Sequence, residues 1–259
     1  MTDSTIKEIN RNTVADSIES LQPIEPPVCK YCGKQYIQQD LKFHERTIKV
    51  WSVPCDCLDK VEAEEQRKKY REKLLERYQN ANIGERYINT TLELLAKMGT
   101  ENVAEAQEYV KNFNPASGKG LHFIGNFGNG KTSIGYAIIK KLVNKGFNCL
   151  STSWNELSLR CHYAKSYDTK ETIEQILSDV SKFDFVMIDE FCPNCKDEKE
   201  IILATELIDR LYRNNKCFLV INNPCDIQAM KQVPRFGKAL DRIREQTQKL
   251  IFQHESYRK

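Results

Sequence analysis

The sequence lacks the long apolar runs of a membrane protein. No stretch approaches the roughly 18 consecutive apolar residues of a spanning helix, and no apolar segment of a secretory signal follows the polar first twenty residues. We therefore expect a cytoplasmic protein with no membrane partner. In that compartment its ten cysteines are expected to bind metal or to lie buried rather than to form disulfides.

The sequence also lacks a strong excess of one charge. Its 39 Lys and Arg residues stand against 36 Asp and Glu residues, for a formal net charge of +3. That balance permits a local basic patch for nucleic acid but does not demand one. There is no internal repeat and no low-complexity run. The 259 residues, 40% of them hydrophobic, can form one large domain or a large and a small one.

Composition divides the chain into four parts. Residues 1–27 are polar and end in PIEPP, which predicts a flexible tail. Residues 28–58 hold four cysteines in two close pairs. Residues 59–82 begin with a run of strong helix formers without Gly or Pro, which predicts a linker helix. Residues 83–259 are predicted to form the main domain.

From Leu121 onward, short apolar runs alternate with helical stretches. The runs are LHFIG, FNCLST, FDFVMID, CFLVIN and KLIFQ. Continuous apolar strands separated by helices are typical of a parallel sheet covered on both faces. We predict an α/β domain with a five-stranded parallel sheet.

Residues 125–132 read GNFGNGKT between an apolar strand and a helix, which fills the phosphate-loop pattern G-x-x-x-x-G-K-[ST]. Glycines let the backbone curl around phosphate oxygens, and the helix N-terminus adds a positive dipole end. Lys131 is predicted to reach the β- and γ-phosphates of ATP, and Thr132 to coordinate Mg²⁺. The predicted loop contacts are Gly125, Asn126, Phe127, Gly128, Asn129, Gly130, Lys131, Thr132 and Ser133.

Polar residues end two later apolar runs of the core. FDFVMIDE ends in Asp189 and Glu190, at the sheet edge where the phosphate loop also lies. Asp189 is predicted to bind Mg²⁺ through water, and Glu190 to polarise the water that attacks the γ-phosphate. CFLVINNP ends in Asn222 and Asn223. An asparagine there can hold the attacking water, although Asn-Asn-Pro is also a turn sequence.

The N-terminal cysteines have metal-ligand spacing. Cys29 and Cys32 form a C-x-x-C pair followed by glycine, and Cys55 and Cys57 follow about 22 residues later. Four thiolates make a closed, structural zinc site, and so short a segment could not bury enough apolar surface to fold unaided. His44 is a possible substitute ligand.

A third cysteine pair, Cys192 and Cys195, also has ligand spacing. No clear second pair stands near it in the sequence, although Cys217 or Cys225 could join it. We interpret these residues as loop cysteines.

Together these elements resemble the AAA+ ATPases of the DnaC/DnaI helicase-loader family and their IstB relatives, over roughly residues 80–259. GERYINTTLE (84–93) resembles the segment before the family's ATPase core, and the helical stretch before FDFVMIDE resembles the loaders' insertion. FGKALDRIRE (236–245) resembles the box with a trans-acting arginine. SYRK (256–259) resembles the terminal sensor segment. An N-terminal zinc module is consistent with loaders of the DnaI type, in which it contacts the helicase.

The resemblance implies roles for three residues. Arg242 would be the finger that reaches a neighbouring subunit's γ-phosphate, and Arg258 a sensor within its own subunit. Asn223, rather than Asn222, would be the first sensor.

The finger assignment has alternatives. Arg235 and Arg244 lie close to Arg242 in the sequence. A surface salt bridge with Asp241 or Glu245 is the structural alternative for Arg242.

The resemblance also places single-stranded DNA contacts around residues 160–167. Basic residues beside aromatics suit backbone contacts and base stacking, although an ordinary amphipathic helix is the alternative. The candidates are Arg160, His162, Tyr163, Lys165 and Tyr167.

The sequence is thus interpreted as an ATP-dependent loader that delivers a DnaB-type replicative helicase to single-stranded DNA in replication initiation. Its subunits would self-associate through the AAA+ domain. One alternative is an IstB-like transposition helper ATPase. Another is a nucleotide-switched adaptor that does not hydrolyse ATP, against which Lys131, Asp189 and Glu190 argue.

Overall fold

The computed structural model describes residues 27–43, 46–52, 55–166, 171–254 and 256. The predicted tail up to residue 26, His44, Tyr167 and Arg258 lie outside the described residues. The chain divides into two compact units, Met1–Tyr70 and Arg71–Lys259.

The first unit contains a hairpin that follows a tight turn. Strands β1 (Ile37–Phe43) and β2 (Arg46–Ser52) pair antiparallel. Before them, the backbone N–H of Gly33 donates to the Cys29 carbonyl at 2.8 Å, and Gly33 adopts φ 72°. Glycine adopts this left-handed conformation without steric cost. This turn is therefore formed by residues that are close together in the sequence, and the glycine after the cysteine pair is the signal for it. The hairpin that follows was not predicted from the sequence.

Helix α2 (Cys57–Asn80) begins in the first unit and ends in the second, and none of its residues is fully buried. Its last turns contact the second unit's core through Leu74 and Tyr78. The Tyr78 hydroxyl donates to Asn144 at 2.9 Å. No helix among the described residues is long and apolar enough to span a membrane.

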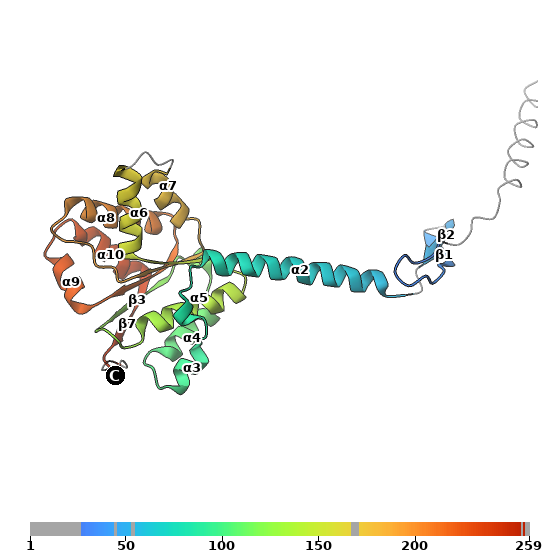
Figure 1. Ribbon diagram of the computed structural model, residues 1–259, viewed down its shortest axis with the longest axis horizontal. Coiled ribbons are helices and arrows are strands. Elements are labelled where there is room, and N and C mark those ends of the chain that lie inside the picture. Colours follow the sequence, from blue (N-terminus) through green and yellow to red (C-terminus); the bar gives the residue numbers. More distant parts are fainter. Residues whose placement is uncertain (1–26, 44–45, 53–54, 167–170, 255, 257–259) are drawn as a thin grey trace, which may run out of the picture. The chain divides into compact units, whose positions relative to one another are not determined.

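The second unit alternates strands and helices, as Figure 1 shows. Its first part contains the 3₁₀ turns η1 (Glu85–Tyr87) and η2 (Pro115–Ser117) and the helices α3 (Leu92–Lys97) and α4 (Val103–Lys111). The strands are β3 (Gly120–Gly125), β4 (Cys149–Ser153), β5 (Phe185–Asp189), β6 (Cys217–Asn222) and β7 (Thr247–Phe252). The remaining helices are α5 (Lys131–Asn144), α6 (Trp154–Ser166), α7 (Ile173–Val180), α8 (Glu198–Arg213), α9 (Pro224–Lys231) and α10 (Phe236–Gln246).

These strands form one parallel sheet in the order β4-β5-β6-β3-β7. The five-stranded parallel sheet predicted from the sequence is confirmed. Strand β3 lies between β6 and the edge strand β7, so the phosphate loop follows an interior strand of the sheet. Strand β6 of this sheet is buried along its whole length, as expected for a parallel strand covered on both faces.

Two hydrophobic clusters lie on opposite faces of the sheet. One packs against α3, α4 and α5, and the other against α6, α7, α8, α9 and α10. Alternation along β5 shows the division: Phe185 and Met187 belong to the first cluster, and Val186 and Ile188 to the second. The same alternation directs Asp189 to the face of α5, the helix that follows the phosphate loop.

Candidate functional site

The phosphate loop leaves β3 at Gly125 and enters α5 at Lys131. A Cβ atom at Gly125 would meet the Phe252 carbonyl oxygen at 2.5 Å, so only glycine fits between the loop and β7. Gly130 has φ 88°, a conformation that glycine adopts far more readily than other residues. The loop backbone is thus shaped by glycines at both ends.

Lys131 is held inside this loop and is 7% exposed. Its ammonium donates to the carbonyl oxygens of Gly125 at 2.7 Å and Asn126 at 2.6 Å. It also donates to Asn129 Oδ1 at 2.9 Å. The cation therefore sits within the loop's curve, which is the place that the phosphate-loop motif assigns to it.

Asp189 and Thr132 face each other across the end of the sheet. Thr132 Oγ1 lies 3.4 Å from Asp189 Oδ1. Burial raises the pKa of the Asp189 carboxyl, and hydrogen bonds from Thr132 and from the Glu190 N–H oppose that shift. A half-buried carboxylate beside a hydroxyl is an oxygen donor set that suits a hard divalent cation.

Glu190 follows directly and is exposed. Its backbone N–H donates to Asp189 Oδ1 at 2.9 Å, and its φ is 48°. This left-handed conformation is uncommon for a residue with a side chain. The hydrogen bond to the preceding carboxylate helps to fix it.

The two asparagines after β6 lie in different surroundings. Asn222 is 1% exposed, accepts a hydrogen bond from His122 Nε2 at 2.8 Å and donates to the Phe191 carbonyl. Asn223 caps α9, and both its backbone N–H and its side-chain amide donate to Asp226, at 3.0 and 3.1 Å. Asn222 is therefore part of the core on the α10 side of the sheet, and Asn223 stands at the sheet edge.

A cavity of about 250 Å³ adjoins the loop and is also lined by the segment before the core. Besides Gly128–Ser133, its lining residues are Arg86, Tyr87, Leu95, Met98 and Thr100. Sequence reasoning assigned no role to these residues. The GERYINTTLE segment was the available signal, since it carries two of them.

This segment is fixed to α5 by two contacts. The Tyr87 ring stacks on Tyr136, with centroids 4.4 Å apart and planes at 19°. The Lys140 ammonium donates to the carbonyls of Tyr87, Ile88 and Thr90. An apolar and aromatic wall beside a phosphate loop has the chemistry to receive a nucleobase.

The three candidate finger arginines differ in exposure. Arg242 on α10 forms an ion pair with Asp209 of α8, and these side chains are 15% and 16% exposed. Its guanidinium lies 5.2 Å from the centroid of the Tyr212 ring. Arg235, with 59% exposure, pairs with Glu198, and Arg244, with 76%, pairs with Asp241.

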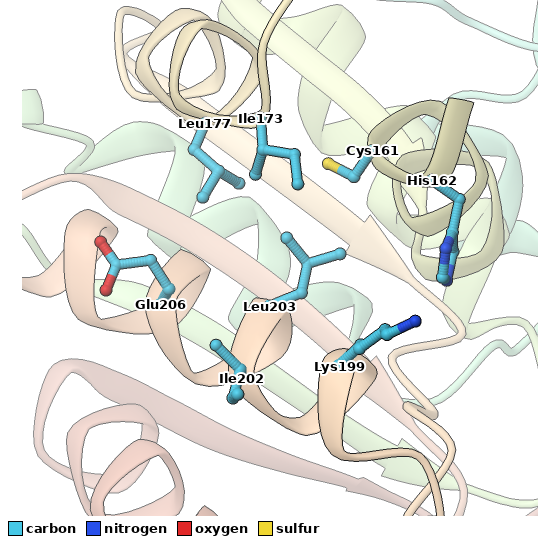
Figure 2. A pocket seen from close by; sticks show the side chains of 8 residues that line it. All are labelled: Cys161, His162, Ile173, Leu177, Lys199, Ile202, Leu203 and Glu206. Carbon is cyan, nitrogen blue, oxygen red and sulfur yellow. The ribbon is translucent and has the colours of Figure 1, made fainter. Parts of the chain in front are cut away.

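The stretch proposed for single-stranded DNA forms the second half of α6. Arg160 pairs with Glu171 through two hydrogen bonds, and Tyr163 is 57% exposed. His162 and Cys161 line an apolar pocket of about 210 Å³ between α6, α7 and α8 (Figure 2). The side chain of Lys165 and the whole of Tyr167 lie outside the described residues.

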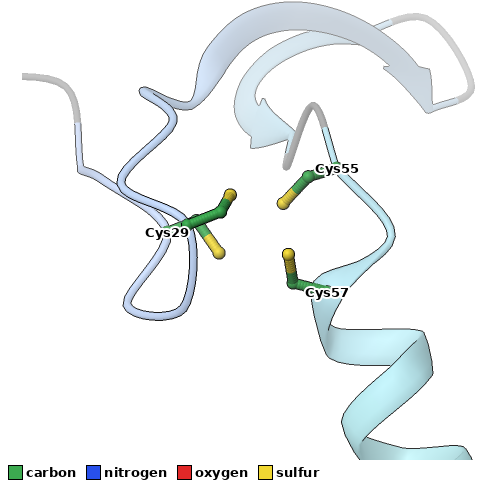
Figure 3. Close-up of side chains that lie close together, drawn as sticks. Cys29, Cys55 and Cys57 are labelled. Carbon is green, nitrogen blue, oxygen red and sulfur yellow. The ribbon is translucent and has the colours of Figure 1, made fainter.

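The four N-terminal cysteines converge in the first unit. The Sγ atoms of Cys29, Cys32, Cys55 and Cys57 lie within 4.8 Å of one another. Figure 3 labels three of these residues, Cys29, Cys55 and Cys57, whose side chains point toward one another. Backbone N–H groups of the turn, first that of Tyr31, lower the pKa of Cys29 to about 7. The Cys57 thiol donates hydrogen bonds to the sulfurs of Cys32 and Cys55, which favours its protonated form and raises its pKa to about 12.

This cluster is the metal-compatible group within the described ranges, and Cys192 and Cys195 belong to no such group there. Cys192 is exposed and Cys195 half-buried. The Cys195 thiol donates weakly to the Pro193 carbonyl at 3.5 Å. Their interpretation as loop cysteines fits this placement.

The sequence was compared with known protein families and with individual proteins. Residues 114–259 match the model of the IstB-like ATP binding protein family. The replicative helicase loader DnaC of Buchnera aphidicola subsp. Baizongia pistaciae is 26% identical over 183 residues, which are 69% of this chain and 73% of that protein.

Solved structures share the fold of the second unit. The DnaC helicase loader superposes with a TM-score of 0.54 at 23% identity, over 65% of this chain and 99% of that one. The DnaI structure gives a TM-score of 0.55 at 17% identity, over 68% and 95%. The second unit therefore has the AAA+ fold of these loaders. Because the family model matches more than half of the sequence, the chain belongs to the IstB-like ATP-binding proteins.

Proposed function

We propose that this protein is an ATP-hydrolysing loader that delivers a DnaB-type replicative helicase to single-stranded DNA. The observation that carries the proposal is that four functional residues lie together at one edge of the sheet. Lys131 lies in the phosphate loop, Thr132 and Asp189 face each other at 3.4 Å, and Glu190 follows at the rim. This edge belongs to a fold shared with DnaC and DnaI.

The Thr132 hydroxyl and the Asp189 carboxylate would hold Mg²⁺. Both offer oxygen ligands, and a cation there would offset the burial that raises the pKa of Asp189. Bound Mg²⁺ would neutralise charge on the phosphates of ATP. Glu190 would orient a water and accept its proton, and Asn223 would hold that water in place.

The site would be completed by a neighbouring subunit. Arg242 would reach the γ-phosphate across the interface, and Arg258 would sense it within its own chain. Within the isolated chain, Arg242 is paired with Asp209, so assembly would exchange that carboxylate for a phosphate. Arg235 and Arg244 are the alternatives for the finger.

Zinc would hold the N-terminal unit together. The four cysteine sulfurs already lie within 4.8 Å of one another, and tetrahedral zinc with Zn–S bonds of about 2.3 Å brings its sulfurs to about 3.8 Å. The all-sulfur ligand set leaves no open position, so the metal would be structural rather than catalytic.

The hairpin of this unit would contact the helicase. Ile37 and Leu41 share one face of β1 and are 53% and 51% exposed. Exposed aliphatic side chains that lie together are typical of a protein–protein contact. The α6 stretch, with its exposed Tyr163, would contact the single strand.

A pull-down with a purified replicative helicase tests this proposal. The full chain should retain the helicase, and the retention should change when ATP is added. The double variant Ile37→Ser/Leu41→Ser should lose the helicase yet still bind ATP. The control Gln38→Ser/Lys42→Ser alters the opposite face of the same strand and should behave as wild type. If the wild-type chain retains no helicase with or without ATP, the loader function is wrong.

An IstB-like transposition helper is the second candidate, because the family model that matches carries that name. It predicts that the chain retains a transposase and not a helicase in the same assay. A non-hydrolysing adaptor predicts ATP binding without turnover. Measuring phosphate release separates it from both ATPases.

A further inference from the structure

A small basic hollow lies on the face of the sheet that packs against α9 and α10. Its volume is about 130 Å³, and it is lined by three cations from different elements. Lys231 ends α9, Arg244 lies on α10 and Lys249 lies on β7. His122 of β3 also lines the hollow, together with aliphatic side chains.

The register of the sheet explains why these residues meet. His122 is paired with Lys249 on the adjacent strand, so both side chains point to the same face. Phe123 and Leu250, one residue further along each strand, belong to the cluster that packs against α5. His122 and Lys249 therefore face the opposite side, toward α9 and α10.

The charged side chains that line the hollow are all positive. No acidic residue lines it in the described part of the chain. Arg244 has only a surface ion pair with Asp241, in which both side chains are more than 70% exposed, and such pairs hold a side chain weakly. Neither Lys231 nor Lys249 has an ion pair with any described residue.

Two arginines elsewhere in this unit are held more firmly than Arg244. Arg160 and Arg210 form two-point ion pairs with Glu171 and Glu174. Like charges around a concave, partly apolar wall concentrate the positive potential. An anion in the hollow would relieve the mutual repulsion of its cations.

The base of the hollow adds no negative charge. His122 is 8% exposed. Asn222 uses its amide N–H to bond Phe191, so its Oδ1 must accept from the Nε2–H of His122. The imidazole is thus the neutral tautomer protonated at Nε2, and burial lowers its pKa to about 4.

We propose that this hollow binds the phosphate groups of single-stranded nucleic acid through Lys231, Arg244 and Lys249. Three cations from separate elements suit successive contacts along a flexible phosphodiester chain. The choice of a nucleic-acid strand over other phosphates rests on the proposed loader function. Arg160 of the α6 stretch is already paired with an acid, so the hollow would supply the main electrostatic contact.

Fluorescence anisotropy with a short fluorescein-labelled oligothymidylate and the full chain tests the proposal. The triple variant Lys231→Ala/Arg244→Ala/Lys249→Ala should bind more weakly. The slope of log affinity against log salt should become shallower by about 2, because each lost phosphate contact removes roughly 0.7 for a single strand.

The matched control is Lys97→Ala/Lys111→Ala/Lys196→Ala, which removes the same charge from exposed positions outside the hollow. It should bind nearly as wild type, and thermal melting should show that both variants are folded. Equal affinity and slope in the two triple variants would overturn the proposal, as would a wild-type chain that binds no oligonucleotide.

Further measurements distinguish a nucleic-acid strand from free nucleotide and from a protein as the ligand of the hollow. The Lys131→Ala variant is titrated with ATP, with and without the triple substitution. ATP binding that survives Lys131→Ala and disappears with the triple substitution would assign the hollow to free nucleotide and overturn the proposal. Loss of helicase retention with oligonucleotide binding intact would assign it to a protein contact, and also overturn it. If instead the wild type binds the strand through the hollow but retains no helicase, the proposed loader function fails and the hollow's assignment stands.

Discussion

Protonation of His122 should destabilise the second unit in mild acid. The imidazole is 8% exposed and donates from Nε2 to Asn222, which is itself 1% exposed. Burial lowers its pKa from 6.5 to about 4, the bond to Asn222 opposes that shift, and the charge of Lys249 adds to it. Below pH 6.5 the imidazole of His122 takes up a proton in the unfolded chain but stays neutral in the folded chain.

The magnitude follows from this difference in pKa. A difference of about 2.5 units corresponds to about 3 kcal/mol, since one unit is worth about 1.4 kcal/mol. This contribution to stability is fully present above pH 6.5 and is lost as the pH falls toward 4. Because Asn222 precedes Asn223 at the sheet edge, the same loss would weaken the proposed nucleotide site.

Urea unfolding followed by circular dichroism at a series of pH values measures the effect. Carboxyl groups titrate in the same range, so the informative quantity is the difference between wild type and His122→Gln, which cannot titrate. The stability of the wild type should fall more steeply below pH 6.5 than that of the variant. Parallel stability curves for the two proteins would refute the assignment of a buried neutral imidazole.

Four further outcomes are expected. Glu190→Gln should bind ATP with near wild-type affinity but release phosphate more slowly by about 10²-fold or more, because general-base catalysis is lost; wild-type turnover would remove Glu190 from the mechanism. Arg242→Ala and Lys131→Ala subunits should each be inactive, and their mixture should regain part of the ATPase activity if the finger acts in trans, whereas no recovery despite proven co-assembly would exclude that role. Elemental analysis should find about one zinc per chain, and serine at any one of the four cluster cysteines should release it. Gly120→Ala should lower the free energy of unfolding by roughly 1–3 kcal/mol, since its Cβ would meet the Phe218 carbonyl at 2.0 Å, while Gly237→Ala, whose Cβ meets nothing within 4 Å, should not.

Local patterns predicted the strands and the phosphate loop because their signals are short-range. GNFGNGKT directly follows an apolar strand, and FDFVMIDE combines an apolar strand with the polar residues that end it. The structure brings Thr132 and Asp189 of these two segments together. The position of the loop within the sheet depended on strand order, which no local pattern encodes.

Contacts between distant segments were not predictable in this way. Tyr87 lines the cavity beside the loop through a stack on Tyr136, 49 residues away in the chain. The ion pair of Arg242 with Asp209 joins two helices, whereas the sequence suggested only partners one to three residues away. The hairpin of the first unit was not predicted, because several of its apolar residues are exposed and so do not mark one buried face in the sequence.

The strand order also governs how this protein can fold during its synthesis. Strand β3, which ends at the phosphate loop, pairs only with β6 and β7 among the described strands. When β3 leaves the ribosome, its first partner is still about ninety residues from being made, because β6 begins at Cys217. The intervening strands β4 and β5 pair with each other, so both partners of that pair are made before β6. We therefore expect that ATP stabilises the nascent chain only late, and that the nucleotide pocket is among the last parts of the domain to form.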